Sequence, residues 1–217
     1  MVEIQARGIL FDMDGTLVNT VECVEKWWRK LAAQHNIDAD QLLLNIHGHP
    51  TYDVLCRWFP PSLHTRECAQ QFEIDLMNDA SGVYAVPGTH EVIRQLQPHQ
   101  WVIVTAATET LALTRLAQVN LPAPLHLVTD KSVSRGKPHP ECFQLGAQML
   151  SISPADSVVF EDSVNGVKAA HAAGATVVGV LTSTSKEKLC EAGADYVIDD
   201  FTNICIKQFD NKLFISW

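Results

Sequence analysis

Two aspartates near the start of the chain, in residues 11–17 (FDMDGTL), are the strongest sign of chemistry in the sequence. Asp12 and Asp14 are two residues apart, so on an extended segment both carboxylates point to the same side. Like charges this close raise one pKa unless a cation is present, and Mg²⁺ prefers such oxygen ligands. The apolar residues 8–11 before the pair are typical of a buried strand, at whose end open α/β sheets bind ligands. The pair is therefore suited to a Mg²⁺ site at a strand end.

Polar side chains stand in comparable surroundings at three later points. Thr105 ends an apolar run, Lys137 precedes a proline, and the acidic pair Glu161 and Asp162 follows another apolar run. Each has an ordinary explanation when taken alone: a residue at a strand end, an exposed lysine, or acidic side chains at a helix N-terminus. Their weight comes from occurring together, in this order, behind the two aspartates.

These four segments, spread over nearly the whole chain, resemble the four motifs of the haloacid dehalogenase-like (HAD) superfamily, in its phosphotransferase branch. The resemblance implies that Asp12 is the nucleophile, which attacks phosphorus in line and forms an aspartyl-phosphate. Asp14 would act as general acid toward the leaving alcohol and then as general base toward water. Mg²⁺ would be held by the Asp12 carboxylate, the Asp14 backbone carbonyl and Asp162, with Glu161 as a further candidate ligand.

The resemblance also assigns a phosphate site and an activity. The Thr105 hydroxyl, the Ala106 backbone N–H and the Lys137 ammonium would stabilise the equatorial phosphate oxygens. The whole-chain pattern is closest to the subgroup of helical-cap sugar phosphatases and β-phosphoglucomutase-like proteins. It implies a Mg²⁺-dependent phosphatase for small sugar or polyol phosphates. Two alternatives stay open: a phosphosugar mutase of the β-phosphoglucomutase type, and a phosphate-binding module without catalysis.

Apolar runs alternate with helical stretches around these motifs. Six runs are typical of buried strands, the last more weakly than the others: residues 8–11, 101–106, 125–129, 157–160, 175–181 and 194–198. Helical patterns lie between them, in residues 88–96, 109–119, 140–150 and 164–173. Strands that alternate with helices of about ten residues predict right-handed βαβ units. The expected fold is α/β, a doubly wound, Rossmann-like parallel sheet.

A stretch of four helical segments interrupts this alternation. They cover residues 21–31, 41–46, 52–58 and 65–79, and no convincing strand stands among them. We therefore expect an all-helical cap domain over residues 18–84, inserted into a core formed by residues 1–17 and 85–217. The resemblance implies that the cap closes over the substrate and selects it.

The break in residues 45–51 (NIHGHPT) is the natural candidate for a cap loop that reaches over the substrate. His47 and Gly48 are its candidate substrate-binding residues. For His47 and for the nearby His49, hydrogen bonding to a substrate and an exposed loop position are equally good interpretations. The C-terminal segment predicts a β-hairpin, because apolar runs in residues 205–209 and 212–215 flank Asp210-Asn211. Such a hairpin would extend the sheet edge or cover a face of the core.

The amino-acid composition limits the kinds of partner that the protein can bind. The 217 residues include 16 Lys and Arg against 25 Asp and Glu, a formal net charge of −9, and they form no basic run. We therefore expect a small phosphorylated metabolite as partner and no nucleic acid. No window approaches the roughly 20 consecutive apolar residues of a membrane span, and no signal peptide is evident. The six cysteines are scattered without a C-x-x-C pair, which favours free thiols in the cytoplasm. We expect a monomer.

Overall fold

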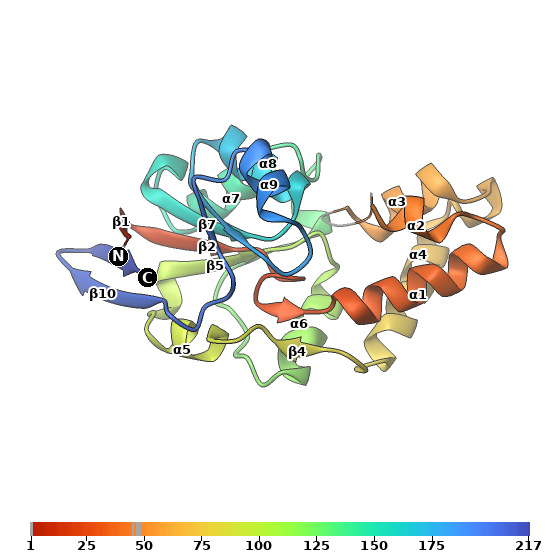
Figure 1. Ribbon diagram of the computed structural model, residues 1–217, viewed down its shortest axis with the longest axis horizontal. Helices are drawn as coiled ribbons and strands as arrows, with labels where there is room; N and C mark the ends of the chain where they lie inside the picture. The colour runs from red at the N-terminus through yellow and green to blue at the C-terminus, as the bar shows by residue number, and fades with distance from the viewer. Residues whose placement is uncertain (1, 45, 47–48) are drawn as a thin grey trace.

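A six-stranded parallel sheet forms the centre of the molecule in the computed structural model, which describes residues 2–44, 46 and 49–217 (Figure 1). Its order is β6-β5-β2-β7-β8-β9. The strands are β2 (Gly8–Phe11), β5 (Trp101–Val104), β6 (Leu127–Val128), β7 (Ser157–Glu161), β8 (Thr176–Val180) and β9 (Tyr196–Ile198). Every residue of β2, β5 and β7 is buried, because helices cover both faces of a parallel sheet. The predicted doubly wound α/β fold is confirmed.

Helices pack on the two faces of this sheet, and each face has its own apolar core. The helices of the α/β part are α5 (Thr89–Arg94), α6 (Glu109–Gln118), α7 (Glu141–Met149), α8 (Val164–Ala173) and α9 (Lys186–Ala192). Phe11 points to one face and stacks on Phe160 with 5.4 Å between ring centroids. Leu10 points to the other face, toward Phe143 of α7. The alternation of side chains along β2 thus anchors both layers.

Four helices lie together at one end of the molecule, away from the chain termini (Figure 1). They are α1 (Val21–Gln34), α2 (Ala39–Leu43), α3 (Thr51–Trp58) and α4 (Arg66–Asn78). The Trp28 ring of α1 packs against α4 and the end of α3, since its centroid lies 4.2 Å from that of Phe72 and 5.8 Å from that of Phe59. No helix in the described part of the chain is long and apolar enough to cross a membrane.

Two short strands join this helical segment to the sheet. β3 (Val18–Asn19) pairs antiparallel with β4 (Tyr84–Ala85). The expectation that residues 18–84 contain no strand was therefore wrong at both ends of the segment. A two-residue strand is too short to show the alternation by which strands are detected.

The predicted C-terminal hairpin is confirmed. β10 (Cys205–Phe209) and β11 (Lys212–Ser216) pair antiparallel, and Asp210 and Asn211 both adopt the left-handed conformation of a two-residue turn. β11 also pairs with β1 (Glu3–Ala6), so the hairpin belongs to a separate three-stranded sheet of order β1-β11-β10. It therefore does not extend the edge of the six-stranded sheet. The polar sequence of β1 gave no strand signal of its own.

Candidate active site

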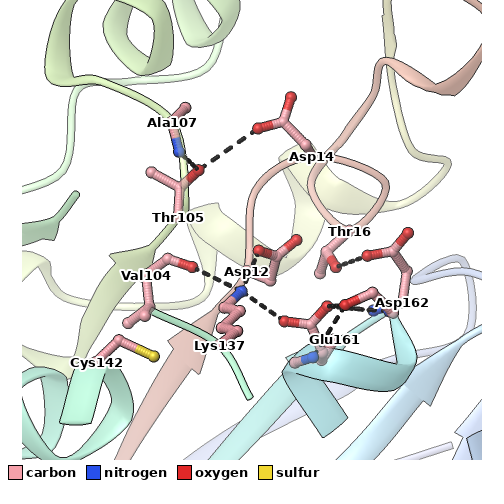
Figure 2. A network of polar contacts seen from close by, with 12 residues as sticks. Asp12, Asp14, Thr16, Val104, Thr105, Ala107, Lys137, Cys142, Glu161 and Asp162 are labelled. Atoms are coloured by element: carbon pink, nitrogen blue, oxygen red, sulfur yellow. Dashed lines mark hydrogen bonds and ion pairs between the residues drawn. The ribbon is translucent and has the colours of Figure 1, made fainter. Parts of the chain in front are cut away.

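The central strands deliver the predicted site residues to one edge of the sheet. Asp12 directly follows β2, Thr105 directly follows β5, and Glu161 ends β7. β2 pairs with both β5 and β7, so Asp12 emerges between the other two. Lys137 enters from the loop before α7 (Figure 2). Four residues therefore meet, although the outermost two, Asp12 and Glu161, are 149 positions apart in the chain.

Lys137 lies between two carboxylates. Its Nζ is 2.6 Å from Asp12 Oδ1 and 2.7 Å from Glu161 Oε2, and it also donates to the Val104 carbonyl at 3.3 Å. The three charged side chains are almost completely buried. Burial alone would lower the pKa of the Lys137 ammonium, but the carboxylates of Asp12 and Glu161 together raise it above its ordinary value. Lys137 therefore carries a fixed positive charge at neutral pH.

Glu161 is held in one position by donors on both of its oxygens. Oε2 binds Lys137, while Oε1 accepts hydrogen bonds from the Ser163 backbone N–H and hydroxyl and from the Asp162 backbone N–H. Gly166 on α8 leaves room for this carboxyl group, since a Cβ at that position would overlap it. Both oxygens of Glu161 are thus engaged within the protein, and the carboxylate acts as a rigid support for Lys137.

Asp12 has an oxygen that is available for a cation, and Asp162 lies beside it. Asp12 Oδ2 is buried and has no hydrogen-bond partner among the described residues. Oxygens of Asp12, Glu161 and Asp162 lie within 4.8 Å of one another. Burial and the Glu161 charge raise the pKa of Asp12 to about 7, and burial together with both neighbouring carboxylates raises that of Asp162 well above its ordinary value. Lys137 balances part of this charge, so the all-oxygen cluster fits Mg²⁺.

A tight turn after β2 shapes the position of Asp162. Gly15 has a φ of 87°, and a Cβ there would overlap the Asp162 carboxylate. The Thr16 hydroxyl lies 3.4 Å from Asp162 Oδ1, and the Thr182 hydroxyl donates to the Gly15 carbonyl. The glycine in the sequence FDMDGTL is therefore required for its conformation and for the close approach of β7's acidic pair.

Asp14 stands apart from the carboxylate cluster and has its own partners (Figure 2). Its oxygens accept hydrogen bonds from the Thr20 hydroxyl at 2.9 Å and from the Thr105 hydroxyl at 3.5 Å. The Ala107 backbone N–H donates to the Thr105 hydroxyl at 3.0 Å and fixes its orientation. Burial raises the pKa of Asp14, and the Thr20 hydrogen bond opposes the rise. A raised pKa favours the protonated form of this carboxyl group, as a general acid requires.

Thr20 is a site residue that sequence reasoning missed. It occupies the N-cap position of α1, yet its side chain makes no capping hydrogen bond, and its hydroxyl donates to Asp14. A threonine before a helical pattern normally indicates a cap. The sequence signal was therefore present, but its ordinary interpretation concealed the contact with Asp14.

A cavity of about 100 Å³ opens onto the carboxylates and is bounded by residues of both the sheet and the helical segment. Asp12, Asp14 and Asp162 line its floor, while Trp28 and His49 come from the helical segment. His49 Nε2 lies 2.9 Å from the Asn165 side-chain nitrogen on α8, which links the two parts of the molecule.

Two predicted substrate-binding residues, His47 and Gly48, lie outside the described residues. Burial, together with the charge of Arg57, lowers the pKa of their neighbour His49, which favours the neutral ring.

A second cavity of about 170 Å³ adjoins the first and shares Thr51, Thr105 and Ala106 with it. Lys137 also lines this second cavity, and so does Glu73 of α4. Glu73 is only 7% exposed, and no motif in the sequence marked it. Only the packing of α4 against α6 shows that this glutamate lines the same cavity as the phosphate-binding residues predicted from the sequence.

Fold and site together define a Rossmann-like α/β protein with a carboxylate-centred site for a charged ligand at the switch between its two halves. A family model described as haloacid dehalogenase-like hydrolase matches residues 6–174. The chain therefore belongs to the haloacid dehalogenase-like hydrolase family, as its four motifs predicted.

Similar proteins cover nearly the whole chain. It is 32% identical to 2-deoxyglucose-6-phosphate phosphatase 1 of Saccharomyces cerevisiae, over 100% of this chain and 97% of that protein. It is 33% identical to hexitol phosphatase A of Escherichia coli, over 95% and 97% of the two chains. The crystal structure of a hydrolase from Pseudomonas syringae matches with a TM-score of 0.76 and 26% identity, over 90% of this chain and 94% of that one.

Proposed function

We propose that this protein is a Mg²⁺-dependent phosphatase that hydrolyses small sugar or polyol phosphates. The observation that carries the proposal is the buried set of Asp12, Asp162 and Lys137, in which one Asp12 oxygen is tied to the lysine and the other is free. The similarity to two phosphatases, whose names specify a hexose phosphate and hexitols, supports the substrate class.

Asp12 is the nucleophile in this proposal. Lys137 holds Oδ1, which leaves Oδ2 to attack the phosphorus in line and to form an aspartyl-phosphate as the alcohol departs. Asp14, with its raised pKa, protonates the leaving oxygen. The resulting Asp14 carboxylate then takes a proton from the water that attacks phosphorus and releases Asp12. The hydroxyl of Thr20 keeps Asp14 aimed at the cavity in both steps.

The Asp12 carboxylate, the Asp14 backbone carbonyl and Asp162 would hold Mg²⁺. When bound, the ion neutralises charge on the carboxylates and the phosphate, so that an anionic nucleophile can approach an anionic substrate. Glu161 contributes by fixing Lys137, because both of its oxygens are already engaged. The phosphate oxygens would be bound by the Lys137 ammonium, the Thr105 hydroxyl and the Ala106 backbone N–H.

We also propose that residues 18–84 act as a cap domain that moves about the paired strands β3 and β4. The contact between His49 and Asn165 would form and break as the cap closes and opens. His47 and Gly48 would then touch the substrate from the cap loop.

Asp12→Asn tests the assignment of the nucleophile. The variant should lose Mg²⁺-dependent phosphate release from hexitol and hexose phosphates by about 10⁴-fold or more, because an amide is not a nucleophile. Circular dichroism and the unfolding midpoint of the variant verify that it folds, and EDTA should abolish the wild-type activity. Turnover by Asp12→Asn close to that of the wild type would contradict the proposal. Isomerised sugar phosphate with no free phosphate released would indicate a mutase instead.

A further inference from the structure

The cavity of about 170 Å³ beside the phosphate-binding residues is lined by three acidic side chains that the proposed mechanism does not use. Asp53 is exposed, whereas Glu73 of α4 and Asp130, which follows β6 in the chain, are more shielded from solvent. Since this cavity shares Thr105 and Ala106 with the catalytic cavity, it offers space for the part of a substrate that lies beyond its phosphate.

Glu73 sits where three helices meet. Its Oε2 accepts a hydrogen bond from the Thr108 hydroxyl at 2.7 Å, and the Thr51 hydroxyl also bonds to its carboxyl group. Thr108 is the N-cap residue of α6, and Thr51 begins α3. Burial raises the pKa of Glu73, while the two hydroxyl donors oppose the rise. The carboxyl group is therefore positioned by its neighbours before any substrate arrives.

One carboxyl oxygen of Asp130 is an unsatisfied hydrogen-bond acceptor among the described residues. Its Oδ1 is buried, and no described residue provides a hydrogen-bond partner for it. Asp130 lies close enough to Glu73 for its charge to raise the pKa of Glu73 further. A buried, unsatisfied acceptor is costly, so such an atom commonly marks the place of a missing donor.

The cations of this cavity are distributed differently. Arg66 and Lys131 also line it, but both side chains are exposed, and the buried Lys137 at its edge is already paired with Asp12 and Glu161. The Arg66 guanidinium lies over the Tyr52 ring, 4.5 Å from its centroid. The shielded carboxylates of the cavity are thus those of Glu73 and Asp130, and the positive charges of Arg66 and Lys131 stand nearer to solvent.

We propose that Glu73 and Asp130 are specificity-determining residues that accept hydrogen bonds from hydroxyl groups of the leaving alcohol, so that the protein selects neutral polyol monophosphates and rejects esters that carry a second phosphate. An ionised carboxylate has acceptors only, and hydroxyl groups are donors that match it. A second phosphate would bring its negative charges against both carboxylates at low dielectric. The inference rests on the proposed phosphatase function and deepens it.

Three substrates separate the hydroxyl contacts from the chemistry: a hexitol monophosphate, a hexose bisphosphate and p-nitrophenyl phosphate, which has no hydroxyl groups. The wild type should have the highest kcat/KM for the hexitol phosphate. Glu73→Gln should lower that value by about tenfold or more, since an uncharged amide replaces a charged acceptor. The same variant should keep the kcat/KM for p-nitrophenyl phosphate within about twofold of the wild-type value. It should also raise the ratio of kcat/KM for the bisphosphate to kcat/KM for the hexitol phosphate.

Two further variants keep the test decisive. Asp130→Asn should change the kcat/KM of each of the three substrates in the same direction as Glu73→Gln does. This second variant keeps the test valid if Glu73→Gln disturbs the junction of the three helices. Glu67→Gln makes the same chemical change on the exposed face of α4 and should leave all three values unchanged.

The contrary results are also distinct. Equal losses for all three substrates in Glu73→Gln and Asp130→Asn would overturn the inference, and so would a wild type that prefers the bisphosphate through Arg66 and Lys131. A wild type that releases phosphate from none of the three with Mg²⁺ would refute the phosphatase function itself, and with it the selection of polyols.

Discussion

Asp12, Glu161 and Asp162 carry an electrostatic cost that folding alone does not explain. Removing charges from water is expensive, and a buried ion pair is weak support for stability. Here three buried carboxylates lie close together with one ammonium group, that of Lys137, and burial together with the neighbouring carboxylates raises the pKa of Asp12 and of Asp162. Such tension is typical of functional sites, where the missing charge is supplied by a ligand.

Gly166 supports this arrangement without touching a substrate. Gly166→Ala should displace the Glu161 carboxyl group, because the added Cβ would overlap it, and Lys137 would lose one of its two ion-pair partners. We expect kcat to fall by about tenfold to a hundredfold in phosphate-release assays, since the catalytic groups require precise positioning.

Gly174→Ala is the matched control at the C-terminal end of the same helix. Gly174 has a φ of 87° but open space around its Cα, so alanine there strains the backbone without disturbing the site. It should lower the unfolding midpoint and leave kcat unchanged. Equal kcat values for Gly166→Ala and the wild type would show that the packing of Gly166 against Glu161 does not matter for turnover.

Most of the site could be predicted from the sequence because its residues directly follow apolar strands. Asp12, Thr105, Glu161 and Asp162 all do so, and the parallel pairing of β2 with β5 and β7 brings them together. Glu73 could not be predicted, because its significance depends on α4 lying against α6. Nothing in the sequence around residue 73 encodes that distant contact.

At the level of elements, α6 joins the helical segment to the sheet. Arg115 of α6 is 1% exposed and donates to the Asp79 carbonyl at 2.9 Å, beyond the end of α4. It also donates to Cys23 of α1 at 3.4 Å and to Gln118 at 2.8 Å. A buried guanidinium that links three helices in this way determines how they sit on the core.

Arg115→Ala should therefore destabilise the protein by about 3 kcal/mol, because it leaves buried acceptors unpaired and creates a cavity. Urea unfolding at constant pH measures the change. The control is Arg94→Ala, which removes an exposed arginine whose ion pair with Glu91 is 74% and 65% exposed. That change should cost little, since surface pairs contribute less than about 1 kcal/mol. Similar losses in both variants would contradict the linking role of Arg115.

Elements were predictable where they are apolar and long. All six core strands and the four helices of the inserted segment appear where the sequence predicts them. The strands β1, β3 and β4 escaped prediction because they are polar or only two residues long. The order of the strands in the sheet could not be predicted either, because the apolar runs do not indicate that β2 lies between β5 and β7.

For the whole molecule, the raised pKa of Asp12 links stability to pH. The native carboxyl group titrates at about 7, against 3.8 in an ordinary environment. Between these values the native state binds more protons than the unfolded state, so this contribution to stability is complete below pH 3.8 and is lost as the pH rises through about 7. Mg²⁺ needs the ionised carboxylate, and its binding should therefore release protons.

We expect Mg²⁺ to raise the unfolding midpoint more at about pH 8 than at about pH 5.5, with the affinity increasing by up to about tenfold per pH unit below neutrality. Thermal unfolding with Mg²⁺ or with EDTA across this range measures the effect. Asp12→Asn, which has no proton to release at this position, should show a much flatter dependence. A Mg²⁺ effect that is independent of pH in the wild type would contradict the link.

The small sheet formed by β1, β11 and β10 brings the two ends of the described chain together. Val2 and Trp217 exchange backbone hydrogen bonds of 3.0 and 3.2 Å. Both ends lie across the molecule from α1–α4 (Figure 1). A short peptide could join them head to tail without approaching the catalytic cavity. The architecture is therefore suited to circular permutation, and to tethering on a solid support with α1–α4 facing away from the surface.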